Sequence, residues 1–332
     1  MFHPTLLWRE FRQGQLVQYN NMTDQTRTLI LPVLKSVRKT LGKAKRWLIK
    51  MALDAKHFGR QAQRMLRSDY PELLFDIALE ERFGQSPFPP LRHLATNEGF
   101  LLLAIEDLQI HWPHNYETTG IGWIYREVFA APEINPHAYE FDNAHMVPGS
   151  WVIDAGASEG FFVHYALRRG CKVIAIEPVP AFVRALELTF RHEIEAGNVR
   201  IVEGAIGDSS GTLWLTLGES DVFSSRVEYT QGNLSVNVYT LDELITEQGI
   251  SDVSFVKMDI EGAELHVLEG ARNILRHQRP VLSIAVYHEQ DTALILKGLL
   301  KRIAPDYKVR FRGAWLRNSD KPRPYMLMAS PK

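Results

Sequence analysis

Short apolar runs recur through the second half of the chain, and a polar or charged residue follows each of them. Segments expected to be helical separate the runs, and one of these extends to about Leu275. Strands that alternate with helices predict an α/β domain built on a parallel, doubly wound sheet. The expected strands cover residues 151–153, 171–176, 199–202, 253–258 and 281–286.

The residues that follow these runs are candidates for a binding site. Asp154, Glu177, Asp259 and His288 each come at the carboxyl end of an expected strand. Ligands of open α/β sheets bind beyond the carboxyl ends of the strands. We therefore expect these four side chains to face one cleft.

The turn after the first run indicates which nucleotide would bind. Its spacing is Asp154-x-Gly156-x-Ser158-x-Gly160, which differs from the G-x-G-x-x-G of dinucleotide sites. Its carboxylates would repel a pyrophosphate but suit a cationic ligand such as S-adenosylmethionine. An ordinary strand-turn-helix junction is the alternative interpretation. Cofactor contacts are expected at Asp154, Gly156, Ala157, Ser158, Gly160, Glu177, Pro178, Ala205 and Asp259.

Residues 151–330 resemble the FkbM-type S-adenosylmethionine-dependent methyltransferases. The resemblance implies the Rossmann-like class I fold with a mostly parallel seven-stranded sheet. It also implies O-methylation, often of sugars or polyketide-type hydroxyls. The chain departs from many members at Ser158 and Glu159, where they carry Asn and an apolar residue. The matching segments are 152–157, 176–178, 239–244, 280–288, 325–329 and, as the most specific, 257–264.

A hydroxyl acceptor is a weak nucleophile and gains from a general base. By position and residue type, His288 is the expected base, with Asp259 or Glu261 orienting it or accepting the proton instead. A histidine that merely caps a strand end is the alternative. A Mg²⁺ site made by Asp259, Glu289 and His288 is a further alternative, but a metal is not expected to be required.

Composition is that of an ordinary globular protein of 332 residues with a formal net charge of −1. A charge near zero implies no general attraction to nucleic acid. The single cysteine, Cys171, cannot form an internal disulfide, which agrees with a reducing cytoplasm. No run approaches the ~18 apolar residues of a membrane span. We expect a cytoplasmic enzyme that acts on a small-molecule or glycan acceptor.

The N-terminal region carries a different pattern. Apolar residues at spacings of three and four predict an amphipathic helix over residues 33–67, which contains eleven Lys or Arg and one acid. Such a helix can pack on the catalytic domain, join two copies of the chain, or lie on anionic lipid at the membrane periphery. Contact with an anionic substrate or nucleic acid is a further alternative, although nothing in the chain resembles a nucleic-acid-binding fold.

The pattern divides the chain into three regions. They are a helical extension over 1–90, a cap or lid over 91–149 and a cofactor-binding catalytic domain over 150–332. Six side chains of the cap could cover the cofactor, namely His111, Trp112, His114, Tyr116, Trp123 and Tyr125. Two other functions stay open, a non-catalytic cofactor-binding scaffold and, against the turn spacing, an NAD-type oxidoreductase.

Overall fold

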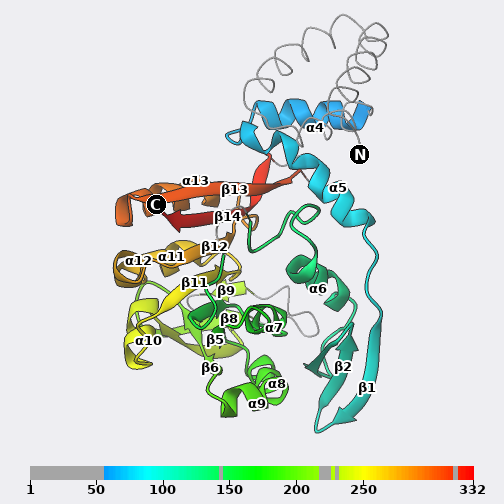
Figure 1. Ribbon diagram of the computed structural model, residues 1–332, viewed down its shortest axis with the longest axis vertical. Helices are drawn as coiled ribbons and strands as arrows, with labels where there is room; N and C mark the ends of the chain where they lie inside the picture. The colour runs from blue at the N-terminus through cyan, green and yellow to red at the C-terminus, as the bar shows by residue number, and fades with distance from the viewer. Residues whose placement is uncertain (1–55, 142–144, 217–225, 229–231, 317–320) are drawn as a thin grey trace, which may run out of the picture. The chain divides into compact units, whose positions relative to one another are not determined.

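The computed structural model describes residues 56–332 except for 142–144, 217–225, 229–231 and 317–320 (Figure 1). Residues 57–332 form one compact unit. Most of the helix predicted over 33–67 lies outside the described residues, and its last part is the helix α4, Lys56–Leu66. In the part of the chain that the structure describes, no helix is long and apolar enough to cross a bilayer.

Residues 151–331 contain a seven-stranded sheet in the order β13-β14-β12-β11-β4-β5-β6. The β4, β5, β6, β11 and β12 strands run parallel, whereas β14 is antiparallel to both β12 and β13. This arrangement confirms the predicted mostly parallel, seven-stranded Rossmann-like sheet. The strands are β4 Trp151–Ala155, β5 Lys172–Glu177, β6 Val199–Glu203, β11 Val253–Met258, β12 Val281–Ala285, β13 Tyr307–Trp315 and β14 Arg323–Pro331.

Helices cover both faces of this sheet, which explains why its central strands are apolar throughout rather than alternating. The α7 and α8 helices pack on one face, and α10 to α13 contact one another on the other (Figure 1). Val152 and Ile153 of β4 are fully buried between these layers. The helices are α7 Phe161–Leu167, α8 Pro180–Thr189, α9 Arg191–Glu195, α10 Leu241–Glu247, α11 Glu264–Glu269, α12 Arg272–His277 and α13 Thr292–Ile303.

Thr240 and Asp242 each cap a helix, but not the same one. The Thr240 hydroxyl accepts a hydrogen bond from the Glu243 backbone N–H at the start of α10. The Asp242 carboxylate instead accepts from the backbone N–H groups of Asn273 and Ile274 in the first turn of α12. Both residues satisfy helix-end donors, so neither is a candidate for catalysis.

A second, four-stranded sheet lies between β6 and β11 in the sequence, in the order β7-β10-β8-β9. The sequence pattern did not predict it. Its strands are short and partly exposed, so they lack the continuous apolar runs of the main sheet. The strands are β7 Ala205–Ile206, β8 Gly211–Thr216, β9 Arg226–Glu228 and β10 Leu234–Tyr239.

The region before the main sheet contains an antiparallel three-stranded sheet and the helix α6. The Tyr70 ring meets Phe311 of β13 edge to face, with centroids 5.2 Å apart, and Asp76 accepts a hydrogen bond from the Gly313 backbone N–H at 2.8 Å. The boundaries predicted at residues 90 and 149 therefore fall inside one compact unit. The elements are the 3-10 helix η1 Pro71–Phe75, α5 Ile77–Gln85, β1 Leu91–Asn97, β2 Phe100–Ile105, β3 Leu108–Pro113 and α6 Ile121–Phe129.

Candidate active site

A cavity of about 900 Å³ opens at the carboxyl ends of the parallel strands. This volume lies within the range of roughly 300 to 1,000 Å³ that is typical of ligand pockets. One half is lined by the turn after β4, the end of β5 and the β7–β8 region. The other half is lined by α6 and by residues that follow β11 and β12. Among the predicted site residues, the lining includes Gly156, Ala157, Ser158, Glu177, Pro178, Ala205, Asp259, Glu261 and His288.

Gly156 brings the ends of β4 and β11 together. Its φ is +77°, and a Cβ at this position would lie 2.2 Å from the carbonyl oxygen of Asp259. No other residue type fits so close to a backbone oxygen. Gly156, which was expected to leave room for a ligand, therefore also allows the ends of β4 and β11 to approach each other.

Gly160 does not line the cavity. It begins α7 with a φ of +85°, and a Cβ there would lie 2.6 Å from the Phe190 ring and 2.8 Å from Leu186. Gly160 therefore packs closely against the end of α8, and the cofactor contact expected there stays a prediction.

Glu177 and Glu159 are buried acids that line the cofactor half of the cavity. The Glu177 carboxylate accepts hydrogen bonds from the backbone N–H groups of Ser158 and Val179, both at 2.9 Å. Burial nevertheless raises the pKa of Glu177 and that of Glu159 to about 7. A bound cation would offset the cost of ionising them here.

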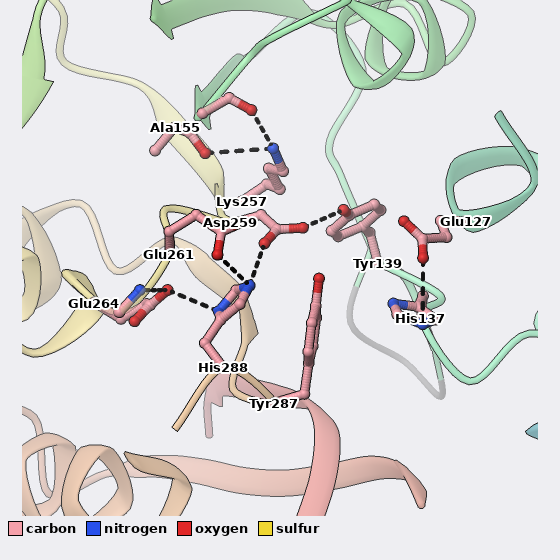
Figure 2. A network of polar contacts seen from close by, with 12 residues as sticks. Glu127, His137, Tyr139, Ala155, Lys257, Asp259, Glu261, Glu264, Tyr287 and His288 are labelled. Atoms are coloured by element: carbon pink, nitrogen blue, oxygen red, sulfur yellow. Dashed lines mark hydrogen bonds and ion pairs between the residues drawn. The ribbon is translucent and has the colours of Figure 1, made fainter. Parts of the chain in front are cut away.

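Asp154 lies below the cavity rather than in its lining. It is 0% exposed, and its Oδ1 lies 3.0 Å from the Lys257 Nζ. The same Nζ donates hydrogen bonds to the carbonyl oxygens of Gly156 at 2.6 Å and Ala155 at 3.3 Å (Figure 2). Burial lowers the pKa of Lys257, but Asp154 and Asp259 outweigh it and raise the pKa above its usual value. Asp154 therefore pairs with an internal lysine, in place of the predicted direct cofactor contact.

Asp259 is held from two sides. Its Oδ2 accepts a hydrogen bond from the Tyr139 hydroxyl at 3.1 Å, and its Oδ1 lies 3.4 Å from the His288 Nε2 (Figure 2). The Tyr139 side chain comes from the segment after α6, so this contact joins the region before the main sheet to the end of β11. Asp259 presents a fixed carboxylate to the cavity.

His288 is surrounded by carboxylates. Besides Asp259, Glu261 Oε2 lies 3.5 Å from its Nε2 and Glu264 Oε1 lies 3.7 Å from its Nδ1 (Figure 2). Burial alone would lower the pKa of His288, but the three carboxylates raise it to about 9. A pKa of about 9 favours the protonated imidazole at neutral pH, whereas a general base must be free to bind the proton that it removes. The role of His288 as general base stays a prediction, and the surrounding carboxylates favour the alternative in which Asp259 or Glu261 accepts the proton.

The structure does not support the alternative of a magnesium site. Glu289 is exposed and does not line the cavity. Across the described ranges, no group of three or more His, Cys, Asp or Glu is arranged to hold a metal ion.

Several side chains of the site carried no expectation from the sequence. Lys257 had a detectable signal, since a lysine inside an apolar central strand is unusual unless it is paired. Tyr139 and His137 come from an irregular segment and were not among the cap residues singled out from the sequence. Of the histidines and aromatic residues in the expected cap, Trp123 lines the cavity. His111, Trp112, His114, Tyr116 and Tyr125 do not.

Comparisons with known proteins agree with this geometry. Residues 154–301 match the family described as the methyltransferase FkbM domain. The chain is 27% identical over 207 residues to 31-O-demethyl-FK506 methyltransferase FkbM of Streptomyces tacrolimicus, covering 52% of this chain and 76% of that protein. It is 25% identical over 182 residues to methyltransferase sdnD of Sordaria araneosa, covering 45% of this chain and 68% of that protein.

A solved structure of methyltransferase FkbM from Methylobacillus flagellatus is 21% identical to the chain, with a TM-score of 0.44. That similarity covers 62% of this chain and about half, 47%, of the other. The seven-stranded sheet and the motif 257–264 at the cavity agree with the domain match. By that match, residues 154–301 of this chain are identified as a methyltransferase FkbM domain.

Proposed function

We propose that this protein transfers the methyl group of S-adenosylmethionine to a hydroxyl group of a small-molecule or glycan acceptor. The observation that carries the proposal is the two-sided cavity. Buried acids on the β4–β5 side suit a cationic nucleotide, and a fixed carboxylate, Asp259, lies on the other side. The matched family implies the same cofactor.

The residues present fit this cofactor. Glu177, at the tip of β5, would accept hydrogen bonds from ribose hydroxyls, and Glu159 would balance the ligand's positive charge. The turn 156–158 and Pro178 would form the adjoining wall. Ala205, in β7, would contact the adenine. Asp154 would act through Lys257, which fixes the backbone of the turn.

The reaction asks little covalent chemistry of the protein. Bound S-adenosylmethionine supplies a methyl group activated by its sulfonium, so that a C–S bond breaks as a C–O bond forms. The protein positions the acceptor, excludes water and takes the hydroxyl proton. Asp259 would accept that proton, since it lines the cavity and is held by Tyr139 and His288. His288, as a cation, would keep this carboxylate in place.

Calorimetry tests the cofactor half. We expect S-adenosylhomocysteine to bind and NAD not to bind. Glu177→Ala should weaken S-adenosylhomocysteine binding by roughly 2 to 3 kcal/mol, because hydrogen bonds to a charged group and two backbone anchors are lost. Glu187→Ala, on the exposed face of α8, is the matched control and should change nothing. Tight NAD binding without a response to S-adenosylhomocysteine would refute the methyltransferase proposal.

The buried acids also predict a pH dependence of cofactor binding. Since burial raises the pKa of Glu159 and Glu177 to about 7, both are partly protonated in the ligand-free protein near neutrality. Folded-state pKa values above the unfolded ones mean that the ligand-free protein loses stability as the pH rises towards and through 7. A cationic ligand lowers these pKa values and so releases protons on binding.

We therefore expect the affinity for S-adenosylmethionine to rise between about pH 6 and pH 8, by at most about tenfold per pH unit for each proton released. Calorimetry in buffers of different ionisation enthalpy measures that release directly. Glu159→Gln should reduce it. An affinity that stays flat across this range, with no proton release, would mean that neither acid senses the ligand.

A non-catalytic, cofactor-binding scaffold is the competing function. It would bind S-adenosylmethionine without turning it over. The position of Asp259 in the cavity, fixed by two contacts, favours the enzyme.

A further inference from the structure

We infer that the acceptor half of the cavity selects an uncharged, hydroxyl-bearing compound and rejects acceptors that carry a phosphate or carboxylate. The selecting pair is the Tyr287 hydroxyl and the Asp259 carboxylate. This inference rests on the proposed function and specifies the substrate class of the same site.

The charged residues of the cavity lining disfavour an anionic acceptor. Of the six acids that line the cavity, Glu127, Asp259 and Glu261 lie in the acceptor half, and Glu159, Glu177 and Asp208 lie in the cofactor half. Among the described lining residues, Lys257 is the one lysine and there is no arginine. The Lys257 ammonium is already engaged by Asp154, Ala155 and Gly156. The lining therefore offers an anion no uncommitted lysine or arginine.

The histidines of the lining do not change this balance. His137 lies 3.4 Å from Glu127, His266 lies 2.6 Å from Asp208, and His288 lies 3.4 Å from Asp259. Each imidazole thus already faces a carboxylate. Proteins recognise phosphate and carboxylate groups mainly with arginine and lysine, and like charges brought together cost several kcal/mol. An anionic acceptor would meet that cost here.

Tyr287 places a hydrogen-bond donor beside Asp259. Figure 2 shows its hydroxyl pointing towards the space beside Asp259 and Tyr139. Its ring is stacked on Trp315, with centroids 5.2 Å apart and planes at 14°, which fixes the direction of the hydroxyl. Burial, then Asp259 and other nearby acids, raise the pKa of Tyr287, so the group stays a hydrogen-bond donor.

A donor opposite an acceptor matches the chemistry of an alcohol. A hydroxyl group can accept from the Tyr287 O–H and donate to Asp259 at the same time. A protonated amine has only donors, so it could pair with Tyr287 only by donating to the phenolic oxygen. The remaining walls include Trp123, Ile124 and Val128 of α6, which suit the carbon skeleton of the acceptor.

Matched acceptors test the charge selection on the full-length chain with radiolabelled S-adenosylmethionine. The probes are methyl glucoside and methyl glucuronide, and a second pair is cyclohexane-1,2-diol with its carboxylated analogue. We expect kcat/KM for the neutral member of each pair to exceed that of the carboxylated member by at least about tenfold. Glu261→Gln should narrow the gap between the neutral and the carboxylated member.

Substitution of Tyr287 tests whether its hydroxyl, together with Asp259, binds the hydroxyl group of the acceptor. Tyr287→Phe keeps the ring on Trp315 and removes the hydroxyl, so kcat/KM for the neutral acceptor should fall by about tenfold or more. The affinity for S-adenosylhomocysteine should change by less than about twofold. Tyr125→Phe is the matched control, because Tyr125 stacks on Phe129 outside the cavity lining.

The outcomes separate this inference from the proposed function. A charged probe methylated as well as its neutral partner overturns the inference, as does a Tyr287→Phe enzyme of unchanged kcat/KM. Binding of S-adenosylhomocysteine with no transfer to any neutral probe also overturns it and leaves the cofactor half standing. Failure to bind S-adenosylhomocysteine at all overturns the proposed function itself.

Discussion

Replacing Asp259 by asparagine is expected to lower the rate of methyl transfer by roughly 10² to 10⁴, the range that a positioned proton acceptor contributes. The amide keeps the size of the side chain and can still accept from Tyr139, but it cannot take the acceptor's proton. The loss should appear in kcat, with the affinity for S-adenosylhomocysteine nearly unchanged. Single-turnover kinetics with a neutral hydroxylated acceptor measures the chemical step.

Two further variants sharpen this test. Asp306→Asn removes an exposed carboxylate that pairs with Arg279 outside the cavity, and it should leave the rate unchanged. His288→Gln removes a cation rather than a base. It should therefore shift the pH profile of kcat. If His288 were the base, the fall in kcat at low pH would come from its protonation, and the substitution would abolish that fall. If Asp259→Asn keeps full activity, proton acceptance belongs to Glu261 or to solvent, and the assignment to Asp259 fails.

Replacing Lys257 by methionine is expected to destabilise the protein by about 3 to 5 kcal/mol, because it leaves the Asp154 carboxylate buried without its partner. The lysine ammonium also ties the carbonyl oxygens of Ala155 and Gly156 to the end of β11. The turn that lines the cofactor half should therefore loosen as well. Urea unfolding followed by circular dichroism measures the change in the free energy of unfolding.

A double variant separates the effect of an unpaired buried charge from the effect of changing the shape of the side chain. Asp154→Asn combined with Lys257→Met removes both charges, so it should recover much of the stability that the single variant loses. Lys308→Met, on an exposed position of β13, is the matched control and should change stability by less than about 0.5 kcal/mol. A Lys257→Met protein as stable as the native one would show that Asp154 is accommodated without a cation.

The expected strands of the main sheet came from local information, and the structure confirms them. An apolar run bounded by polar residues reports burial on both faces, and a run such as 171–176 contains that signal within itself. The β7–β10 sheet was missed because its short strands are half exposed, so their pattern is no different from that of a loop. The placement of Glu177 and Asp259 at the cavity also followed from the sequence, since parallel strands end at one edge.

By itself, the sequence determined that a parallel α/β sheet forms and that acids gather at its carboxyl edge. Both conclusions depend on residues that are neighbours in the chain, because the pattern of apolar residues and the position where each strand ends are local. Tertiary structure alone decided what those acids do. Lys257 lies beside Asp154 because β11 pairs with β4 across about a hundred residues, and that pairing takes Asp154 out of the cavity. Likewise, Glu261 and Glu264 from the segment after β11 lie close to His288 from the end of β12 and raise its pKa. The charge state of a side chain depends on which groups lie within a few ångströms of it. Those distances are set by the tertiary structure and cannot be read from the spacing of residues along the chain.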